Sequence, residues 1–328
     1  MQIKNLELQN DLFLAPMAGF TDPAFRMLCK KQDVALTFTE MISVNALSRN
    51  NNATLKLLYS FADEKPIAVQ LFGSKLEHFI KAIENLKVYE KENNKRFDVI
   101  DINFGCPASK IIKQGSGSAL LQRPERVKQI VEAVVSVAER PVFCKIRSGI
   151  SKDKINAVEI AKACENAGAS LITVHARTQK QGYSGKADWS VIKQVKDNVN
   201  IPVCANGDIT SYDDYIKIKE QTNADYFMIG RAALSNIFIF KEILNKKKLK
   251  YSITKNVIGT NTIGITKEMK IDALIDYIDF SQKCNINFNQ VKVHAQHFLK
   301  GLANSTKIRN KLSRIEDING ILKIIKEL

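Results

Sequence analysis

Short apolar runs alternate with amphipathic or alanine-rich stretches along the first 240 residues of the chain. The runs are rich in β-branched residues and bounded by polar ones, which is typical of buried parallel strands. The stretches between them predict helices, among them Leu76–Glu90, Pro124–Glu139, Lys154–Ala167 and Tyr212–Gln221. Eight strands are expected, at Leu12–Pro16, Leu36–Glu40, Ile67–Phe72, Asp98–Asn103, Val142–Arg147, Leu171–Ala176, Val203–Gly207 and Tyr226–Arg231.

Eight strands, each followed by a helix, predict an α/β fold of the (β/α)₈ or TIM-barrel type. The competing architecture is a doubly wound sheet, which favours a GxGxxG turn after its first strand, and Ala15–Gly19 has no such pattern. Beyond the barrel the periodicity is helical, with no strand signal. We therefore expect a catalytic barrel over residues 1–245, a basic connector over 246–266 and a small all-helical C-terminal domain over 267–328.

The charge of the chain adds a candidate partner. The 328 residues carry a formal net charge of +15 and a pI near 9.4. Residues 241–328 hold 17 Lys and Arg against 8 Asp and Glu, a net +9 in the last quarter. A surplus of this size is typical of proteins that meet a polyanion, whereas a compositional bias toward Lys, Asn and Ile is the plainer explanation.

The cysteines and the apolar content indicate a cellular compartment. None of the six cysteines forms a CxxC pair, so no zinc or other metal site is expected. No secretory signal precedes the first strand, and no apolar run approaches the length of a membrane span. The sequence indicates a cytoplasmic protein with reduced thiols and no membrane association.

Polar side chains stand at the carboxyl end of every predicted strand, where barrel enzymes place their chemistry. Cys106 is on a glycine-containing turn past the fourth strand, as a proton donor or nucleophile requires. A small buried hydrophobe is the alternative for any free cysteine. The other candidates at strand ends are Pro16, Met17, Glu40, Gln70, Asn103, Lys145, Arg147, His175, Arg177, Asn206, Gly207, Gly230 and Arg231.

These residue types suit a flavin and a pyrimidine. Lys145 lies between apolar residues and needs an anionic or acceptor partner, either a reduced flavin ring or a structural salt bridge with Glu40 or Asp101. Gln70 and Asn103 can donate and accept, which suits a pyrimidine-like ring. The ends of the seventh and eighth strands, Asn206–Asp208 and Gly230–Arg231, predict a phosphate site.

The segment Gly115–Ser118 is rich in glycine but lacks the Lys-Thr continuation of a P-loop, so it does not predict a nucleotide triphosphate site. Lys110 and Lys113 make the neighbouring loop basic. This loop either touches a polyanion at the mouth of the site or is a solvated turn.

Taken together, the motifs resemble those of the tRNA-dihydrouridine synthases, and most closely the B-type bacterial branch. The resemblance runs from about residue 12 to the carboxyl terminus and covers the barrel motifs in order. The residues that carry it are Leu14–Asp22, Val69–Gly73, Asn103–Pro107, Lys145–Arg147, His175–Thr178, Tyr183–Trp189, Asn206–Asp208 and Gly230–Arg231.

The resemblance implies an enzyme that uses FMN, with NADPH or NADH as reductant, to convert specific uridines in tRNA to 5,6-dihydrouridine. It implies hydride transfer from N5 of the flavin to C6 of a flipped uracil, and a proton from Cys106 to C5. FMN is then expected at Pro16, Met17, Gln70, Lys145, His175, Asn206, Gly207, Asp208, Gly230 and Arg231. The substrate is expected at Asn103, Lys145, Arg147, Arg177 and Lys110, and the protein is expected to act as a monomer.

Two other functions compete with this one. A dihydroorotate- or dihydropyrimidine-dehydrogenase-like flavoenzyme would share the barrel and FMN but act on a free pyrimidine, which needs no basic tail. A non-enzymatic RNA-binding protein would explain the charge but not the polar strand ends. Turnover of free uracil or orotate, and the presence or absence of bound flavin, separate the three.

Overall fold

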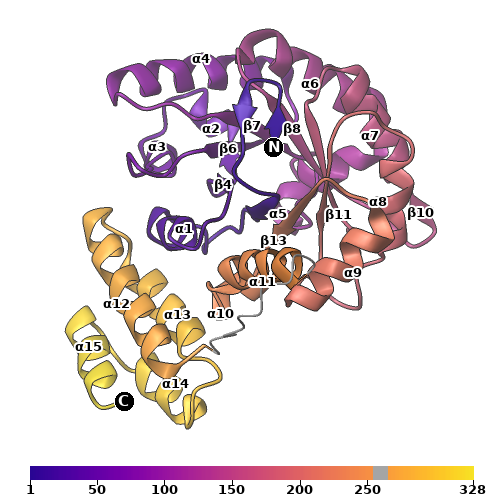
Figure 1. Cartoon of the computed structure of the whole chain (residues 1–328). Coiled ribbons are helices and arrows are strands. Elements are labelled where there is room, and N and C mark those ends of the chain that lie inside the picture. The colour runs from indigo at the N-terminus through magenta and orange to yellow at the C-terminus, as the bar shows by residue number, and fades with distance from the viewer. Residues whose placement is uncertain (254–264) are drawn as a thin grey trace.

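The computed structural model describes residues 1–253 and 265–328, without the side chains of 248–253. A parallel barrel surrounded by helices occupies the residues before α11 (Ile239–Ile253), and a group of helices lies against one side of it (Figure 1). The barrel strands are hydrogen-bonded in chain order, and the last pairs with the first. They are β3 (Leu12–Leu14), β4 (Thr37–Phe38), β6 (Ile67–Phe72), β7 (Val99–Asn103), β8 (Val142–Arg147), β11 (Leu171–His175), β12 (Val203–Asn206) and β13 (Tyr226–Ile229).

The barrel closes between its first two strands. A parallel bridge joins Phe13 to Leu36, and the N–H of Leu14 donates to the carbonyl of Leu36 at 3.0 Å. A short strand β5 (Ile42–Ser43) adds to the edge of β6. The predicted (β/α)₈ barrel is confirmed, and each barrel strand lies within its predicted run.

The helices cover the outside of the barrel. The principal ones are α1 (Pro23–Lys30), α4 (Leu76–Glu92), α6 (Pro124–Ala138), α7 (Ala157–Asn166), α8 (Trp189–Lys196), α9 (Tyr212–Thr222) and α11 (Ile239–Ile253). Shorter segments are α2 (Val44–Leu47), α3 (Asn52–Lys56), α5 (Ser109–Ile112), the 3₁₀ turn η1 (Gly117–Gln122) and α10 (Arg231–Ser235).

One helix begins later than expected. Lys154 and Ile155 form β10, which pairs with β9 (Gly149–Ser151) in a small hairpin, so α7 starts only at Ala157. The expectation of a helix over Lys154–Ala167 is therefore wrong at its amino end. The amphipathic spacing extends into β10 because this strand is exposed, and a two-residue exposed strand leaves a pattern like that of a helix end.

Two apolar cores fix the orientation of the barrel. One fills its interior with fully buried aromatic residues such as Phe13, Phe38 and Phe143. Residues of an amino-terminal hairpin, β1 (Gln2–Ile3) and β2 (Leu6–Glu7), belong to this same core. The second core lies between strands and helices. Because the interior is packed, a site can open only at the carboxyl ends of the strands.

The helices after the connector are α12 (Lys267–Lys283), α13 (Phe288–Phe298), α14 (Ser305–Ser313) and α15 (Ile318–Lys326). Their apolar residues join the core that covers the barrel, so this helical region is packed on the barrel. Of the connector predicted over 246–266, residues 246–253 continue α11, which runs through the predicted boundary at residue 245, and residues 254–264 lie outside the described residues. The three-part division of the chain therefore stays a proposal.

A buried polar cluster joins the helical region to α1. The hydroxyl of Tyr277 donates to Oδ2 of Asp22 at 2.9 Å, and Nε2 of His294 lies 3.2 Å from the same oxygen. The other oxygen of Asp22 caps α1 by accepting from the N–H of Phe25. His294 also stacks on the ring of Phe25, 4.9 Å between centroids. We call Asp22, Tyr277 and His294 the interface cluster.

Replacing Tyr277 with phenylalanine is expected to lower the free energy of unfolding by about 1.5–3 kcal/mol, since a hydrogen bond to a carboxylate is lost while the ring keeps its packing. Chemical denaturation measures this change. Tyr212→Phe is the control, because the hydroxyl of Tyr212 has no hydrogen bond among the described residues. If both variants are as stable as the parent, the cluster does not hold the helical region in place.

Candidate active site

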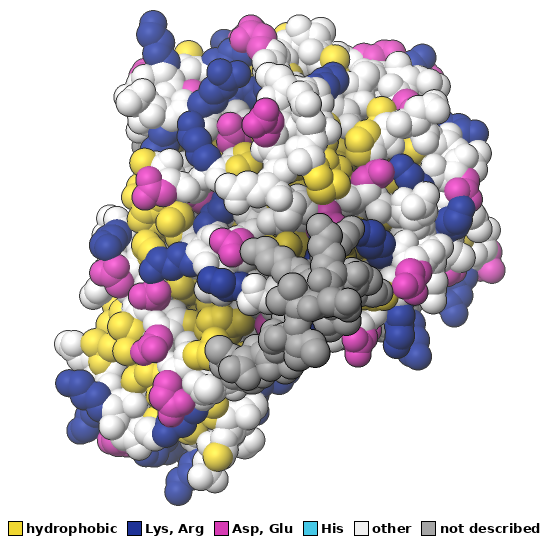
Figure 2. All heavy atoms as spheres, viewed as in Figure 1, with side chains coloured by type: hydrophobic (Ala, Val, Ile, Leu, Met, Phe, Trp, Pro, Cys, Tyr) yellow, Lys and Arg dark blue, Asp and Glu magenta, His cyan; other side chains and the backbone are white. Residues whose placement is uncertain are grey.

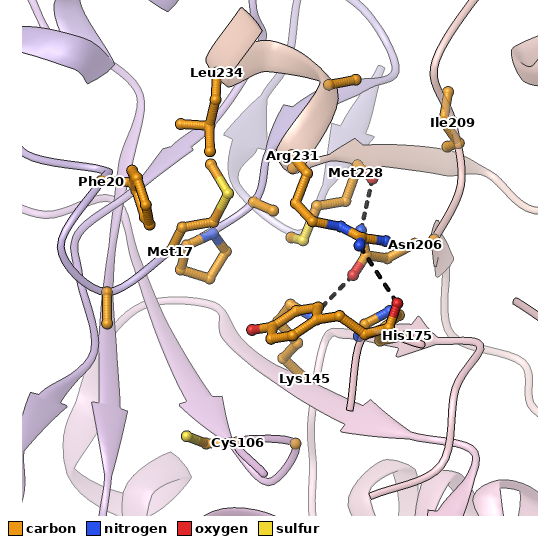
Figure 3. A pocket seen from close by; sticks show the side chains of 18 of the residues that line it. Met17, Phe20, Cys106, Lys145, His175, Asn206, Ile209, Met228, Arg231 and Leu234 are labelled. Atoms are coloured by element: carbon orange, nitrogen blue, oxygen red, sulfur yellow. Dashed lines mark hydrogen bonds between the residues drawn. The ribbon is translucent and has the colours of Figure 1, made fainter. Parts of the chain in front are cut away.

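A cavity of about 950 Å³ opens at the carboxyl ends of the barrel strands, with residues from every strand or the loop after it in its wall. Figure 3 shows Cys106 at one end of this space in that view and Leu234 at the other, with Lys145, His175 and Arg231 to one side. The predicted residues in the wall are Pro16, Met17, Gln70, Asn103, Cys106, Lys145, Arg147, His175, Asn206, Gly207, Asp208, Gly230 and Arg231. The predicted Arg177 and Lys110 are not among them.

Lys145, on β8, presents a partly satisfied ammonium group to the cavity. Its Nζ donates to Oδ1 of Asn206 at 3.1 Å, and Nδ2 of Asn206 donates to the carbonyl of Met228 at 2.7 Å (Figure 3). Burial lowers the pKa of Lys145 to about 8. Within the described part of the chain it forms no ion pair with Glu40 or Asp101, so the structural salt bridge considered from the sequence is not formed.

His175 ends β11 and is neutral. Burial, together with the charges of Lys145, Arg147, Arg177 and Arg231, holds its pKa far below the usual range for histidine. A neutral imidazole offers one donor and one acceptor. His175 can therefore bind a polar ring edge without adding charge.

The Cys106 loop is held from two sides. Oδ1 of Asn103 accepts the N–H groups of Gly105 and Cys106, each at 2.9 Å. On the other side, the hydroxyl of Ser118 donates to the carbonyl of Cys106 at 2.8 Å. Gly117 has φ +59°, and a Cβ there would lie 2.9 Å from the same carbonyl oxygen. The turn at Gly115–Ser118 therefore supports the Cys106 loop, a role that the sequence did not indicate.

Burial raises the pKa of the Cys106 thiol, and the nearby Arg147 and Lys145 lower it only in part. The thiol thus carries its proton at neutral pH, as a proton donor must.

Alkylation of Cys106 by iodoacetamide is expected to accelerate about tenfold per pH unit from pH 7 to 9, without a plateau, because only the thiolate reacts and its fraction rises throughout this range. Mass spectrometry of the Cys106 peptide measures the rate. A plateau below pH 8 would mean that the thiol is already ionised there, which contradicts a raised pKa.

Arg147 spans two loops at the edge of the cavity. Its Nε donates to the carbonyl of Gly105 at 2.7 Å, and its Nη1 donates to the carbonyls of Thr178 and Gly182 at 3.0 and 2.7 Å. A guanidinium has five N–H donors. Three are used in these contacts, and the two on Nη2 remain for an occupant of the cavity.

The other two predicted substrate residues lie elsewhere. Arg177 is 2% exposed and binds Asp208 at 2.7 and 2.8 Å and the carbonyl of Gly185 at 2.6 Å, so it anchors the loop after β11. Lys110 is exposed on α5. Neither is brought to the cavity.

The cavity wall also contains residues that the sequence did not single out for the site. Tyr183 is 61% exposed and lies between two guanidinium groups, 5.6 Å from that of Arg147 and 5.3 Å from that of Arg231. His297 and Lys300 reach the wall from the helical region, where His297 packs edge-on against Phe20. Tyr183 falls within a recognised motif, but only the packing of α13 on the barrel brings His297 and Lys300 to this cavity.

Within residues 1–253 and 265–328, no three His, Cys, Asp or Glu side chains gather into a group that could hold a metal ion. None of the helices described there combines the length and apolar character that crossing a lipid bilayer needs.

Comparison with known proteins identifies the family. The family described as dihydrouridine synthase (Dus) matches residues 13–327. A probable tRNA-dihydrouridine synthase of Aquifex aeolicus is 34% identical over 322 residues, covering 97% of this chain and 96% of its own. The tRNA-dihydrouridine synthases B of Pasteurella multocida and Shewanella oneidensis are 36% and 40% identical, covering 97% and 85% of this chain and 92% and 83% of their own.

Solved structures of similar fold are much more distant in sequence. A 2-naphthoyl-CoA reductase in complex with 2-naphthoyl-CoA aligns with a TM-score of 0.59 at 13% identity, over 75% of this chain and 51% of that one. A variant of morphinone reductase in complex with tetrahydroNAD aligns with a TM-score of 0.54 at 12% identity, over 75% and 89%. At these identities the likeness concerns the fold alone.

Proposed function

The chain belongs to the dihydrouridine synthase family, enzymes that reduce uridine in tRNA, and from this premise we propose that it does so with FMN and NADPH or NADH. The observation that carries the proposal is the shared cavity. A protonated thiol, a cationic lysine, a neutral histidine and two glycine-containing strand ends all line it. We further propose that the protein is a cytoplasmic monomer whose helical region binds tRNA.

The cavity has the groups that FMN requires. The residues that would hold it are Pro16, Met17, Gln70, Lys145, His175, Asn206, Gly207, Asp208, Gly230 and Arg231. The Lys145 ammonium uses one of its three N–H groups on Asn206, which leaves two for the anionic edge of a reduced ring. Arg231 is half exposed, and its polar contacts within the described residues are long, 3.4 Å to the carbonyl of Tyr183 and 3.4 Å to Asp208, so its guanidinium is available to a phosphate.

When bound and reduced, FMN supplies the hydride for C6 of the uracil ring. Cys106 would give the proton to C5, and its loop is fixed by Asn103 and Ser118 so that the thiol faces the cavity. The free N–H groups of Arg147 would hold a uracil carbonyl, which accepts hydrogen bonds. The cavity lies at the mouth of the barrel, so the target base must leave its stack to enter.

The proposal is tested with the purified protein. It is expected to show flavin absorbance and to oxidise NADPH. It is also expected to form dihydrouridine in tRNA that has been isolated from cells without this protein. Turnover of free uracil or orotate without tRNA would favour the free-pyrimidine reductase instead. A colourless protein that cannot be reconstituted with FMN would contradict the site assignment.

Gly207→Ala is expected to weaken FMN binding about tenfold or more. Gly207 has φ +126°, and a Cβ there would lie 2.9 Å from Ala187 and 3.3 Å from the ring of His175, so the cavity wall must shift. Strain of about 1–3 kcal/mol at such a position corresponds to a loss of this order. Flavin titration measures the affinity. Gly182→Ala is the control for backbone strain alone, because Gly182 also has a positive φ, +57°, but no atom lies within 4 Å of the added Cβ. A smaller loss of FMN affinity in Gly182→Ala is expected.

A further inference from the structure

A chain of side-chain hydrogen bonds runs beneath the Cys106 loop, across β6 and β7. Nε2 of Gln70 donates to Oδ2 of Asp101 at 2.6 Å. Nδ2 of Asn103 donates to Oε1 of Gln70 at 2.8 Å. Oδ1 of Asn103 then accepts the N–H groups of Gly105 and Cys106. The carboxylate of Asp101 is thus linked through two amides to the backbone of the proposed proton donor.

The direction of each amide is fixed from both ends of this chain. At one end, two backbone N–H groups require an oxygen of Asn103, which turns its nitrogen toward Gln70. At the other end, the carboxylate oxygen of Asp101 accepts, which requires the nitrogen of Gln70. The two requirements agree, so each of the two amides has one orientation that satisfies every partner.

Asp101 is a buried carboxyl group that lies behind the cavity wall. It is fully buried, and it does not line the cavity. Its Oδ1 has no hydrogen-bond partner, and it forms no ion pair with Lys145 within the described residues. Burying a carboxyl group that is only partly hydrogen-bonded costs free energy, so its retention calls for a role. Among the described residues, its side-chain hydrogen bond is to Gln70.

We propose that Asp101 is a positioning residue, which fixes the amide orientations of Gln70 and Asn103 and thereby the place of the Cys106 loop, without touching substrate or cofactor. The proposal rests on the role given to Cys106 above. In chemical terms, Asp101 acts on the proton-transfer step through two amides.

The same arrangement determines what the wall offers to an occupant. Each amide nitrogen has two N–H groups, and the chain uses one of each. Both side chains line the cavity, and the second N–H of each nitrogen is left to them, besides a 4.0 Å contact of Asn103 with the sulfur of Met41. The oxygen of Gln70 accepts one hydrogen bond in the chain and keeps its second lone pair, whereas the oxygen of Asn103 uses both. This part of the wall therefore offers two donors and one acceptor, which suits the alternating carbonyl and N–H groups of pyrimidine and flavin rings.

Asp101→Asn tests the proposal with little change of shape. An amide at this position can present either its oxygen or its nitrogen to Gln70, so the orientation is no longer enforced. Dihydrouridine formation is expected to fall about 10²-fold, the cost of misplacing a catalytic group by about an ångström. The affinity for tRNA is expected to stay within about twofold of the parent. Flavin reduction by NADPH is measured at saturating FMN, because Gln70 is among the residues proposed to hold FMN, and its rate is expected to fall far less than dihydrouridine formation.

A second measurement does not depend on activity. In the protein without FMN, alkylation of Cys106 by iodoacetamide is expected to become several-fold faster in Asp101→Asn, because a released loop exposes the thiol. Asp98→Asn is the matched control. Asp98 directly precedes β7 and accepts a hydrogen bond from the N–H of Ile67 in β6, and it is not part of the hydrogen-bond chain to Cys106. The control is expected to match the parent in both measurements.

The outcomes separate the inference from the proposed function. Parent-like activity and alkylation in a folded Asp101→Asn protein would overturn the positioning role. Parent-like activity in Cys106→Ala would instead overturn the function of the thiol, while the alkylation comparison would still test Asp101. Asp101→Ser moves the acceptor oxygen out of reach of Gln70. It is expected to show the same fall in dihydrouridine formation and the same faster alkylation, and it replaces Asp101→Asn in the experiment if that variant fails to fold.

Discussion

Replacing Cys106 with alanine is expected to lower dihydrouridine formation by about 10²–10⁴-fold, the usual cost of losing a positioned proton donor. FMN binding and flavin reduction by NADPH are expected to stay near the parent values, because the thiol serves only the step at C5. Rapid mixing of the reduced protein with tRNA measures the affected step directly. The change is small in volume, and Asn103 and Ser118 bind the backbone at position 106, so the loop keeps its anchors.

Cys284→Ala is the control for this experiment. Cys284 is also half buried, but its thiol donates to the carbonyl of Phe280 in α12, away from the cavity wall. It is expected to leave the rate unchanged. A Cys106→Ala protein that reduces tRNA at the parent rate would make Cys106 a structural residue.

Neutralising three basic residues of the helical region is expected to weaken tRNA binding about 10²-fold near 0.15 M salt. Lys300, Lys307 and Arg314 are exposed and form no ion pair among the described residues, so their charges are available to phosphates. The logarithm of the binding constant falls with the logarithm of the salt concentration, with a slope of roughly 0.7–0.9 per phosphate contact. Each contact therefore raises the tRNA affinity about fivefold at this salt concentration. The Lys300→Gln/Lys307→Gln/Arg314→Gln protein is therefore expected to have a slope shallower by about 2–3.

Substitution is preferable to deleting residues 246–328, because deletion would remove Tyr277 and His294 and expose Asp22 and the apolar face of α1. Other basic residues of the region are already engaged: Lys311 pairs with Glu327, and Lys292 donates to the carbonyl of Ile315. Figure 2 shows Lys and Arg side chains mixed with acidic ones over α12–α15. Because of this mixture, the variant replaces only basic residues that form no ion pair among the described residues.

The control carries the same loss of charge elsewhere. Lys128→Gln/Lys152→Gln/Lys154→Gln removes three positive charges from α6 and the β9–β10 hairpin, away from α12–α15 (Figure 1). Electrophoretic or fluorescence binding at several salt concentrations gives both slopes. Equal losses in the two proteins would mean that net charge, and not the helical region, governs binding.

The barrel and its strand ends could be predicted because both depend on local pattern. A buried parallel strand is a short apolar run, and the polar residue that follows it marks the carboxyl end. Gln70, Cys106, Lys145, His175 and Asn206 were found in this way and meet at one cavity. The family and the enzyme class predicted from these motifs are confirmed.

Features that depend on tertiary contacts could not be predicted. Arg147 ends β8 and Arg177 lies two residues past the end of β11, yet Arg177 binds Asp208 and does not line the cavity. His297 enters the site only because α13 packs against the barrel. The orientation of the Gln70 and Asn103 amides depends on partners from two strands, and no spacing in the chain encodes it.

The interface cluster limits how this protein can be recombined with its relatives. Asp22 belongs to α1, early in the chain, while Tyr277 and His294 belong to its last quarter. Lys31, just after α1, also pairs with Asp276 of α12 at 2.8 Å. A graft of α12–α15 from another member of the family would separate these partners unless α1 travelled with it. The segment that can be exchanged between relatives is therefore discontinuous in sequence. It consists of α1 and α12–α15, which must come from the same protein to keep their contacts.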